Sequence, residues 1–250
     1  GGISSSSGLT GLVGSGSGRF RYNSDESTTD YPLALGSGLH GIYRENPTVN
    51  VAVENKTMTY GNALPTWTYT TSGMVNGDQV AQAFASPSVS VGGATSTSGS
   101  YTAGSHTLTA SGMTSSQLGY AVGTLTTGTM TVNTKAATLS GLTAANKVYD
   151  GTTSATVAHS GATFTGLVTG DTVTASGTTG SFSTKQVGTG KTVTLSGTTY
   201  GGADAANYTF TDQASTTAAI TPKAATLSGL TAANKVYDGT TTATVAHGGA

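Results

Sequence analysis

The sequence predicts an all-β protein made of tandem small strand-rich domains, and three features of the chain support this fold class. Residues 135–162 return almost unchanged at residues 223–250, with a period of 223 − 135 = 88 residues. A near-identical block at domain-sized spacing indicates tandem copies of one folding unit. Apolar and polar residues alternate around Val49, Val51 and Val53, as on a half-buried strand. Threonine, glycine and asparagine supply the polarity, and they favour strands and turns.

The composition excludes several classes of protein. Charged residues make up 8% of the chain, against about 25% in typical globular domains, and the net charge is −1. We therefore expect no basic surface for nucleic acid and no insertion into a membrane, since no apolar run is long enough for a spanning helix. The chain has no cysteine, which rules out disulfides, thiolate metal sites and cysteine nucleophiles. Regularly spaced apolar residues argue against disorder despite the many serines and glycines.

Changes in composition, together with the repeat, predict four segments. Residues 1–45 are rich in glycine and serine and then in charge, and we interpret them as a connector. Residues 46–134 form a first repeat, residues 135–222 a second, and residues 223–250 the truncated start of a third. Because residues 223–250 lack most of their partner strands, we expect that they cannot complete a domain alone.

Residues 46–134 are expected to be a diverged copy of the 88-residue unit. Four sequence blocks occur in the same order in both repeats, so we predict the same strand order in both. The paired blocks are NKTMTYG (55–61) with NKVYDG (146–151), GMVNGDQV (73–80) with GLVTGDTV (166–173), HTLTASG (106–112) with KTVTLSG (191–197), and GYAV (119–122) with ANYTF (206–210).

Three local patterns give more specific expectations. In the connector, Arg19 and Arg21 alternate with aromatic residues, which predicts a strand with one basic and one aromatic face. Residues 78–85 could form one short helix, with Asp78 as its N-cap and residues Val80, Ala81 and Phe84 facing inward. Tyr149 and Tyr237 each precede Asp-Gly, a pair that turns sharply, and we expect both rings to be buried in their own domains.

These blocks resemble known repeat families. The segment with KVYDGTT, GLVTGDTV and ANYTFT is similar to the YDG-type repeat, and the segment from TYGNALP to GMVNGD is similar to the MBG-type repeat. Both types occur in long bacterial surface adhesins of the filamentous-haemagglutinin kind, which are exported by two-partner secretion. The segment GRFRYNSDES…GIYRENP (18–47) resembles the connector that follows the β-helical shaft in such proteins. The periodicity leaves two folds open for each repeat, an immunoglobulin-like sandwich or a β-grasp-like sheet with a short helix.

Few residues are candidates for chemistry. The four histidines are scattered, with His159 and His247 at the same position of successive blocks, and we expect surface or packing roles for them. Asp204 and Asn207 could bind calcium, but no dense acidic loop supplies the six to eight oxygens required, so a role in shaping turns is favoured. Asn55 and Asn207 begin N-x-T sequons, a weak signal in a threonine-rich chain. No metalloprotease, phosphate-loop or nucleophile-elbow motif is present, so we expect neither an enzyme nor a cofactor.

Trp67 and Tyr69 are the candidate ligand-binding residues. They lie two apart, so they share one strand face and could form a stacking platform for sugar rings. The alternative is that these rings fill the core of their domain, as large aromatic side chains usually do. Threonines at residues 66, 68 and 70 would supply the solvent face and favour the core interpretation.

The resemblance implies a structural function. We expect a repeat stalk of a secreted or surface-attached bacterial adhesin, which projects a binding region for cell adhesion or biofilm formation. The implied partners are an outer-membrane transporter during export and surface polysaccharide or host glycans bound by the whole protein. The alternative is a carbohydrate-binding module that uses Trp67 and Tyr69.

Overall fold

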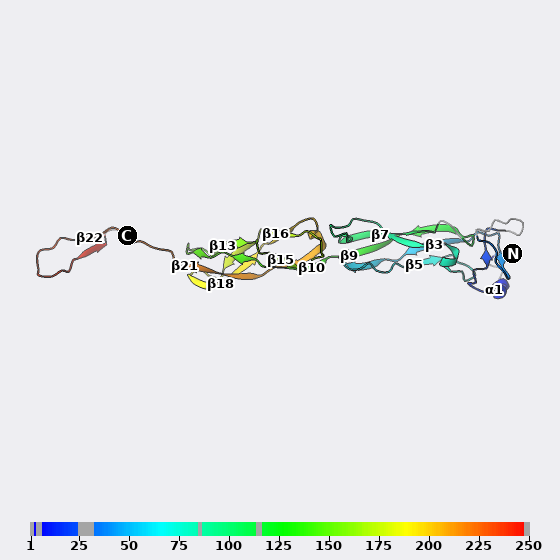
Figure 1. The fold of residues 1–250 in the computed structure, drawn as a ribbon, viewed down its shortest axis with the longest axis horizontal. Helices are drawn as coiled ribbons and strands as arrows, with labels where there is room; N and C mark the ends of the chain where they lie inside the picture. Colours follow the sequence, from blue (N-terminus) through cyan, green and yellow to red (C-terminus); the bar gives the residue numbers. More distant parts are fainter. Residues whose placement is uncertain (1–2, 4–6, 25–32, 85–86, 114–116, 248–250) are drawn as a thin grey trace. The chain divides into compact units, whose positions relative to one another are not determined.

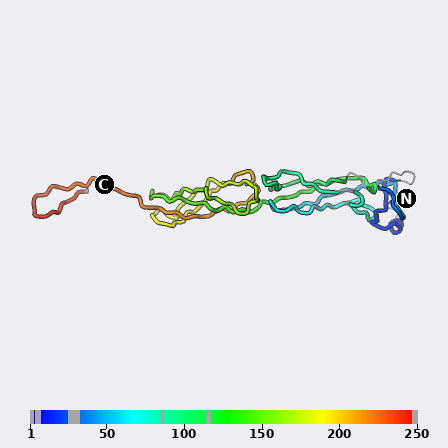
Figure 2. The backbone as a smooth tube through the Cα atoms, in the orientation of Figure 1, coloured from blue at the N-terminus to red at the C-terminus, as the bar shows by residue number. Residues whose placement is uncertain are grey.

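The computed structural model describes residues 3, 7–24, 33–84, 87–113 and 117–247, and their fold is mainly β, as predicted (Figure 1). The chain divides into two compact units, and its path through them can be followed in Figure 2. Unit 1 comprises Gly1–Leu139, Phe164–Ala175 and Tyr200–Thr211; unit 2 comprises Ser140–Thr163, Ser176–Thr199 and Asp212–Ala250. Two segments of the second repeat therefore pack with the first repeat in unit 1. No helix in the described part of the chain is both long and apolar enough to cross a membrane.

The connector begins with helix α1 (Ser7–Val13) and continues into the parallel strand pair β1 (Phe20–Arg21) and β2 (Gly41–Ile42). Phe20 and Tyr22 are fully buried, as their alternation suggests. Of the two arginines expected on the other face, Arg19 is exposed, whereas Arg21 is buried. The Arg21 guanidinium donates to four backbone carbonyl oxygens, those of Gly18, Phe20, Leu33 and Ala34. Arg21 therefore organises the connector from inside and contributes no basic surface.

The first repeat contains two sheets. Its elements are β3 (Thr48–Val53), β4 (Lys56–Thr59), β5 (Tyr69–Ser72), α2 (Val80–Ala83), β6 (Ser88–Val91), β7 (Gly104–Ser111), β8 (Ala121–Thr126) and β9 (Gly128–Asn133). The strand orders are β5-β3-β8 and β4-β9-β7-β6. The valines of β3 alternate inward as predicted and join Leu108 of β7 and Met130 of β9 in one buried cluster. The core of this repeat thus lies between its two sheets.

The second repeat has elements β10 (Lys135–Ser140), β11 (Thr143–Ala144), β12 (Lys147–Val148), β13 (Ser154–Ala155), β14 (Val157–Ala158), β15 (Thr163–Thr165), β16 (Thr174–Ser176), β17 (Thr179–Phe182), β18 (Gly188–Ser196), β19 (Thr199–Gly201), η2 (Ala205–Asn207), β20 (Tyr208–Thr211) and β21 (Ser215–Thr221). Its main sheets have the orders β15-β10-β20 and β12-β21-β18-β17-β13. The pairs β11–β14 and β16–β19 form two further small sheets.

The two repeats share one strand order, which confirms the prediction from the sequence blocks. β5-β3-β8 corresponds to β15-β10-β20, and β4-β9-β7-β6 corresponds to β12-β21-β18-β17, to which the second repeat adds β13. The strand senses agree as well: β3–β8 and β10–β20 are parallel, and so are β4–β9 and β12–β21. The two facing sheets of the first repeat correspond to the sandwich alternative, but these parallel pairs distinguish it from the antiparallel immunoglobulin sandwich.

The expected helix of residues 78–85 is shorter than predicted, and its N-cap assignment is wrong. Helix α2 spans Val80–Ala83, and its N-cap is Gln79, which forms a reciprocal capping box with Gln82. Asp78 lies outside the helix and is buried, because its carboxylate accepts hydrogen bonds from two tyrosine hydroxyls instead. Phe84 is buried as expected, whereas Ala81 is exposed. The end of the expected helix falls outside the described residues.

The third block contains one antiparallel pair, β22 (Leu230–Ala232) and β23 (Val245–His247). Its side chains are exposed from Lys223 to Ala246. The expected burial of the YDG tyrosines is wrong in both blocks. Tyr237 is 93% exposed and Tyr149 is 37% exposed, so neither ring is buried in its own block.

Candidate functional site

Two clusters with buried tyrosine rings in unit 1 join polar groups from successive parts of the chain. The first, here called the Asp78 junction, consists of Tyr22, Asp78 and Tyr120. Asp78 Oδ2 accepts hydrogen bonds from the hydroxyls of Tyr22 at 2.7 Å and Tyr120 at 3.0 Å. The two rings also contact each other, with centroids 4.6 Å apart. Tyr22 comes from the connector and the other two residues from the first repeat, so this junction holds the connector to that repeat.

The second cluster, the Asp171 junction, consists of Tyr60, Asp171 and Tyr208. Asp171 Oδ2 accepts hydrogen bonds from the hydroxyls of Tyr60 at 2.6 Å and Tyr208 at 2.5 Å. The rings pack edge to face with centroids 5.4 Å apart. Tyr60 belongs to the first repeat, and the other two residues belong to the second. The same combination of residue types, one aspartate and two tyrosines, therefore joins the first repeat to the second.

The two junctions are equivalent in detail. Asp78 and Asp171 both come from the Gly-Asp block, and Tyr120 and Tyr208 both come from the block that forms β8 or β20. The hydroxyl of each of these tyrosines also accepts from the backbone N–H of the valine three residues before the aspartate, Val75 at 3.2 Å and Val168 at 2.8 Å. Each repeat thus supplies an aspartate and a tyrosine to its junction, and the preceding segment supplies the third residue.

The protonation states suit these contacts. Burial is the main cause that raises the pKa of each junction tyrosine, Tyr22, Tyr60, Tyr120 and Tyr208, so the four hydroxyls stay protonated and act as donors. Burial also raises the pKa of Asp78, although the two tyrosine hydroxyls oppose this shift. Among the described residues, the second oxygen (Oδ1) of Asp78 and of Asp171 is buried without a hydrogen-bond partner.

Asp204 and Asn207, the candidate calcium ligands, lie beside the Asp171 junction and bind backbone groups. Asp204 is 1% exposed and accepts from the N–H groups of Thr172 at 2.8 Å and Thr97 at 3.1 Å, and from the Thr97 hydroxyl. Asn207 Oδ1 accepts from the N–H of Ala103 at 2.8 Å. Thr97 and Ala103 belong to the β6–β7 loop of the first repeat. Both side chains therefore fasten that loop to the second repeat, and no cluster of three or more potential metal ligands occurs in the described ranges.

The backbone at Gly61 of the first repeat also lies close to Val168 of the second repeat. Gly61, directly after Tyr60, has φ +74°, a conformation that side chains with a Cβ rarely adopt. A Cβ at this position would lie 2.3 Å from Val168 Cγ2. The glycine therefore lets the first repeat approach the loop that carries Asp171.

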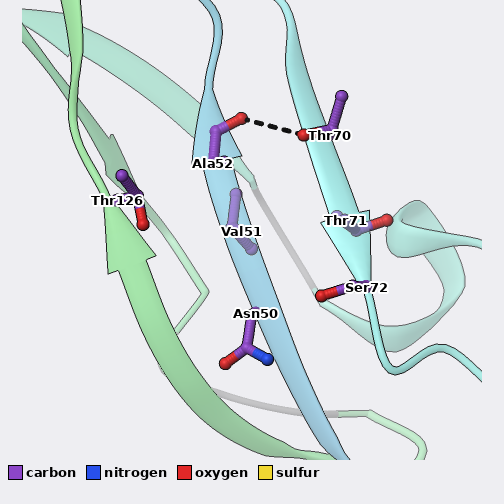
Figure 3. Close-up of a pocket in the computed structure, with 7 residues that line it drawn as sticks. All are labelled: Asn50, Val51, Ala52, Thr70, Thr71, Ser72 and Thr126. Carbon is purple, nitrogen blue, oxygen red and sulfur yellow. Dashed lines mark hydrogen bonds between the residues drawn. The ribbon is translucent and has the colours of Figure 1, made fainter.

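Tyr69 begins the edge strand β5, and Trp67 lies two residues earlier, before the strand starts. Both rings are half-buried and pack against the core cluster, while Thr68 and Thr70 between and beside them are exposed. A pocket of about 260 Å³ occurs on the same sheet, lined by Asn50, Val51, Ala52, Thr70, Thr71, Ser72 and Thr126 (Figure 3). Because Thr70 and Ser72 point to the face opposite Tyr69, this pocket does not include the two rings. The pocket and the rings therefore do not form one ligand site.

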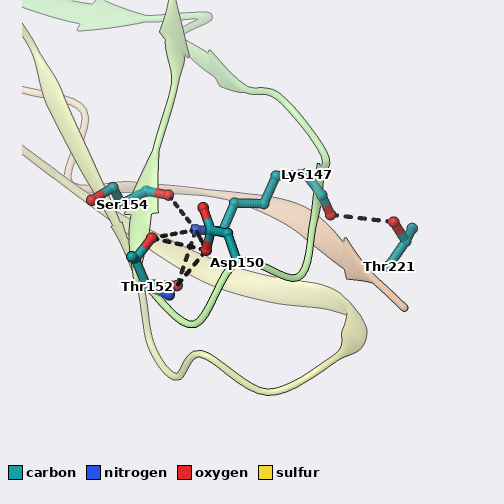
Figure 4. A network of polar contacts seen from close by, with 5 residues as sticks. All are labelled: Lys147, Asp150, Thr152, Ser154 and Thr221. Atoms are coloured by element: carbon teal, nitrogen blue, oxygen red, sulfur yellow. Dashed lines mark hydrogen bonds and ion pairs between the residues drawn. The ribbon is translucent and has the colours of Figure 1, made fainter. Parts of the chain in front are cut away.

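The YDG turn is a local polar network (Figure 4). Lys147 Nζ donates to Asp150 Oδ1, to the hydroxyl and carbonyl oxygens of Thr152, and to the Ser154 carbonyl oxygen, each at 2.9 Å. Asp150 Oδ1 also accepts from the N–H and the hydroxyl of Thr152. These hydrogen bonds, that from Lys147 first, lower the pKa of Asp150 to about 2. The turn is an exposed structural element in which the lysine and aspartate neutralise each other.

The remaining polar candidates pair with nearby groups of the chain. His40 and His106 lie within hydrogen-bond distance of the backbone oxygens of Gly38 and Thr102, and His159 Nε2 lies 3.0 Å from the Thr178 hydroxyl. Of the two sequon asparagines, Asn55 is exposed and its Oδ1 accepts from the Thr129 N–H. Asn207 is 3% exposed, which leaves no room for a glycan in this fold.

Sequence reasoning identified the blocks that supply the junctions but missed the junctions themselves. Tyr60 and Asp171 are 111 residues apart, and no local pattern connects them. A usable signal exists in hindsight: the Gly-Asp pair and the tyrosine of the GYAV or NYTF block occur in both repeats. In a chain with so few carboxylates, a shared aspartate and a shared tyrosine indicate a common contact.

Family models identify the repeat types. The model described as MBG domain (YGX type) matches residues 49–131, and the model described as YDG domain matches residues 133–218 and again residues 221–250. These matches confirm the two repeat types that the sequence resembles. No curated protein and no solved structure matches the chain.

Proposed function

The chain carries an MBG-type repeat and YDG-type repeats, and we propose that it is a structural spacer, a repeat stalk within a large bacterial adhesin. One observation carries the proposal: the same tyrosine–aspartate–tyrosine junction joins the connector to the first repeat and the first repeat to the second. Repeat proteins are stabilised by such nearest-neighbour interfaces together with the intrinsic stability of each repeat. A junction that recurs with each repeat suits a chain whose contribution is length.

The hydrogen bonds of three carboxylates, those of Asp78, Asp171 and Asp204, support a role without catalysis. The aspartates of the two junctions accept hydrogen bonds from tyrosine hydroxyls, and Asp204 accepts from backbone N–H groups and a threonine hydroxyl. A general base or nucleophile needs access to substrate and a group that activates it. We propose that these carboxylates hold the chain together and take no part in a reaction.

The wider context of the spacer belongs to the same proposal. The protein acts at the bacterial surface or after secretion, and it passes through an outer-membrane transporter of a two-partner system. Adhesion or biofilm formation depends on a binding region carried by the whole protein, with surface polysaccharide or host glycans as its ligands. The low charge of the chain, net −1, suits a segment that binds neither nucleic acid nor an anionic membrane.

Deletion of one period in the whole protein tests the spacer role. Removal of residues 135–222 joins Thr134 to Lys223, and residues 223–250 then continue in the place of 135–162. We expect secretion and target binding to persist, with the reach of the binding region shortened by one repeat, as electron microscopy of the surface would measure. Loss of target binding in a secreted, folded deletion variant would contradict the spacer role.

A carbohydrate-binding module is the second candidate, and one observation favours it: Trp67 and Tyr69 are only half-buried. Titration of purified 1–250 with surface polysaccharide tests it directly. The module hypothesis expects binding that is lost in Trp67→Ala and Tyr69→Ala but kept in Tyr149→Ala, the matched change of a half-exposed ring elsewhere. The spacer hypothesis expects no binding by any of the four proteins.

A further inference from the structure

Unit 2 has an exposed apolar end at the last strand of the second repeat. Val148, Tyr149 and Val187 are 55%, 37% and 48% exposed. Their positions follow from the strand register, because Val148 pairs with Thr221 and Gly188, next to Val187, pairs with Ile220. All three residues thus lie at the same end of strand β21. The hydroxyl of Tyr149 makes no hydrogen bond within the described part of the chain.

Tyr149 occupies in the second repeat the position that Tyr60 occupies in the first. The N–H of Tyr60 donates to the carbonyl oxygen of Asn133 at 2.9 Å, and the N–H of Tyr149 donates to that of Thr221 at 2.9 Å. Asn133 and Thr221 are each followed two residues later by the lysine that opens the next block, Lys135 or Lys223. Both tyrosines therefore stand beside the end of the last strand of their repeat.

The neighbours on Tyr60 and Tyr149 nevertheless differ. Tyr60 is fully buried, because residues 164–175 and 200–211 of the next repeat supply Asp171 and Tyr208. The block that follows Tyr149, residues 223–250, corresponds to residues 135–162 and contains neither of those segments. Tyr149 is exposed in this chain because the groups that cover Tyr60 have no counterpart next to it.

We propose that the Val148–Tyr149–Val187 end is a docking surface for a complete YDG repeat joined to it at Lys223. The occupant is the pair of segments equivalent to residues 164–175 and 200–211. Their aspartate, at the position of Asp171, accepts from the Tyr149 hydroxyl, and their tyrosine, at the position of Tyr208, packs on the Tyr149 ring. The loop between β17 and β18, residues 183–187, takes the place of the β6–β7 loop of the first repeat.

This inference deepens the spacer role and rests on it for its biological meaning, since it states how one YDG repeat holds the next. It also gives the Tyr-Asp-Gly sequence two separate tasks. Asp150 closes the local turn with Lys147, whereas Tyr149 is left free to bind the following repeat. The tyrosine of a YDG block is therefore a contact residue between repeats.

Nitration of tyrosine by tetranitromethane tests the proposal in two chains. One is the protein 1–250, and the other is the same chain with residues 163–222 repeated after Ala250, which completes the second YDG repeat. In 1–250 we expect Tyr149 and Tyr237 to react and Tyr60 to be protected. In the extended chain we expect the rate at Tyr149 to fall about tenfold, which corresponds to about 1.4 kcal/mol in favour of the docked state.

The extended chain contains its own controls. Tyr237 then takes the place that Tyr149 has in 1–250, so it should stay reactive, and Tyr60 should stay protected. Peptides with Tyr149 and Tyr237 are distinguished in mass by Ser154 and Thr242. Replacement of the appended copy of Asp171 by Ala should restore the reactivity of Tyr149.

Two outcomes would overturn the proposal. The first is an unchanged nitration rate at Tyr149 in an extended chain whose appended strands are protected from amide exchange. The second is an appended repeat that does not fold, because the same sequence folds next to Tyr60 and should therefore fold on an equivalent surface. Neither outcome touches the spacer role, which the deletion of residues 135–222 tests separately.

Discussion

Residues 135–162 and 223–250 differ at two positions, yet they have different structures. In the first block Leu139 and Leu142 are buried, at 1% exposed each, whereas the equivalent Leu227 and Leu230 are 67% and 48% exposed. In the first block, the opening strand β10 pairs with β20. The second block, residues 223–250, contains no segment equivalent to β20. The difference in burial therefore comes from partner strands remote in sequence and not from the blocks themselves.

Most local contacts of the first block recur in the second. Strands β11–β14 and β22–β23 share one register, since Thr143 pairs with Ala158 and Thr231 pairs with Ala246. The Lys147–Asp150–Thr152 turn recurs as Lys235, Asp238 and Thr240, with the same set of hydrogen bonds among them. A YDG block alone therefore forms a strand pair and a turn, whereas its leucines are buried only in the complete repeat.

The largest expected difference between the blocks is in the leucines. Leu139→Ala should lower the free energy of unfolding by about 2–5 kcal/mol, because it leaves a cavity in a packed core. Leu227→Ala, the matched change in the exposed block, should alter it by less than about 0.5 kcal/mol. Urea unfolding of 1–250 and the two variants measures both values. A large loss in Leu227→Ala would mean that residues 223–250 contribute to a core after all.

A smaller difference is expected between the tyrosines of the two repeat ends. Tyr60→Phe removes the hydroxyl that donates to Asp171 and should cost about 1.5–3 kcal/mol, the range for hydrogen bonds to charged groups. Tyr149→Phe removes a hydroxyl without a partner in the described residues and should be close to neutral. Thermal and urea unfolding of both variants in 1–250 give the comparison. Equal effects would show that the Asp171 junction does not stabilise unit 1.

The sequence predicted the strand order because alternation and repeat blocks are local properties. Val49, Val51 and Val53 could be assigned to one buried face from their spacing alone, and the block order carried this assignment to the second repeat. The exposure of Tyr149 could not be predicted in this way. Whether such a ring is covered depends on residues remote in the sequence, as Tyr60 shows, and neither the turn sequence nor the hydrophobicity of the ring contains that information.

The junctions were missed for a related reason. Asp78 precedes a helix, so its local pattern is that of an N-cap, but the hydroxyls of Tyr22 and Tyr120 compete for the same carboxylate and bind it in a buried site. Tyr22 is 56 residues from Asp78, and a propensity argument does not extend over that distance. The candidate site was therefore predictable as a set of shared residues but not as a set of contacts.

The smallest expected effect concerns the turn that both blocks share, and it tests whether that turn is local. The hydrogen bond from Lys147 is the main cause that lowers the pKa of Asp150 to about 2 from an ordinary 3.8, and that from Lys235 lowers the pKa of Asp238. Since each carboxyl has a lower pKa in the turn than in the open chain, the turn is favoured at neutral pH. This contribution begins to fall below pH 3.8 and, for Asp150, is lost as the pH falls through about 2.

Titration of the two carboxyl groups by NMR measures these pKa values separately. We expect both to lie below the ordinary value, with Asp150 the lower, because the Lys147 side chain is less exposed than that of Lys235 and lies 5.6 Å from the centre of the Phe182 ring. Lys147→Met and Lys235→Met should each return only the aspartate of the same turn toward its ordinary pKa. If Asp238 instead titrates normally in 1–250 while Asp150 does not, the turn requires a complete repeat. That result would contradict the conclusion that the Lys147–Asp150–Thr152 turn forms from local contacts alone.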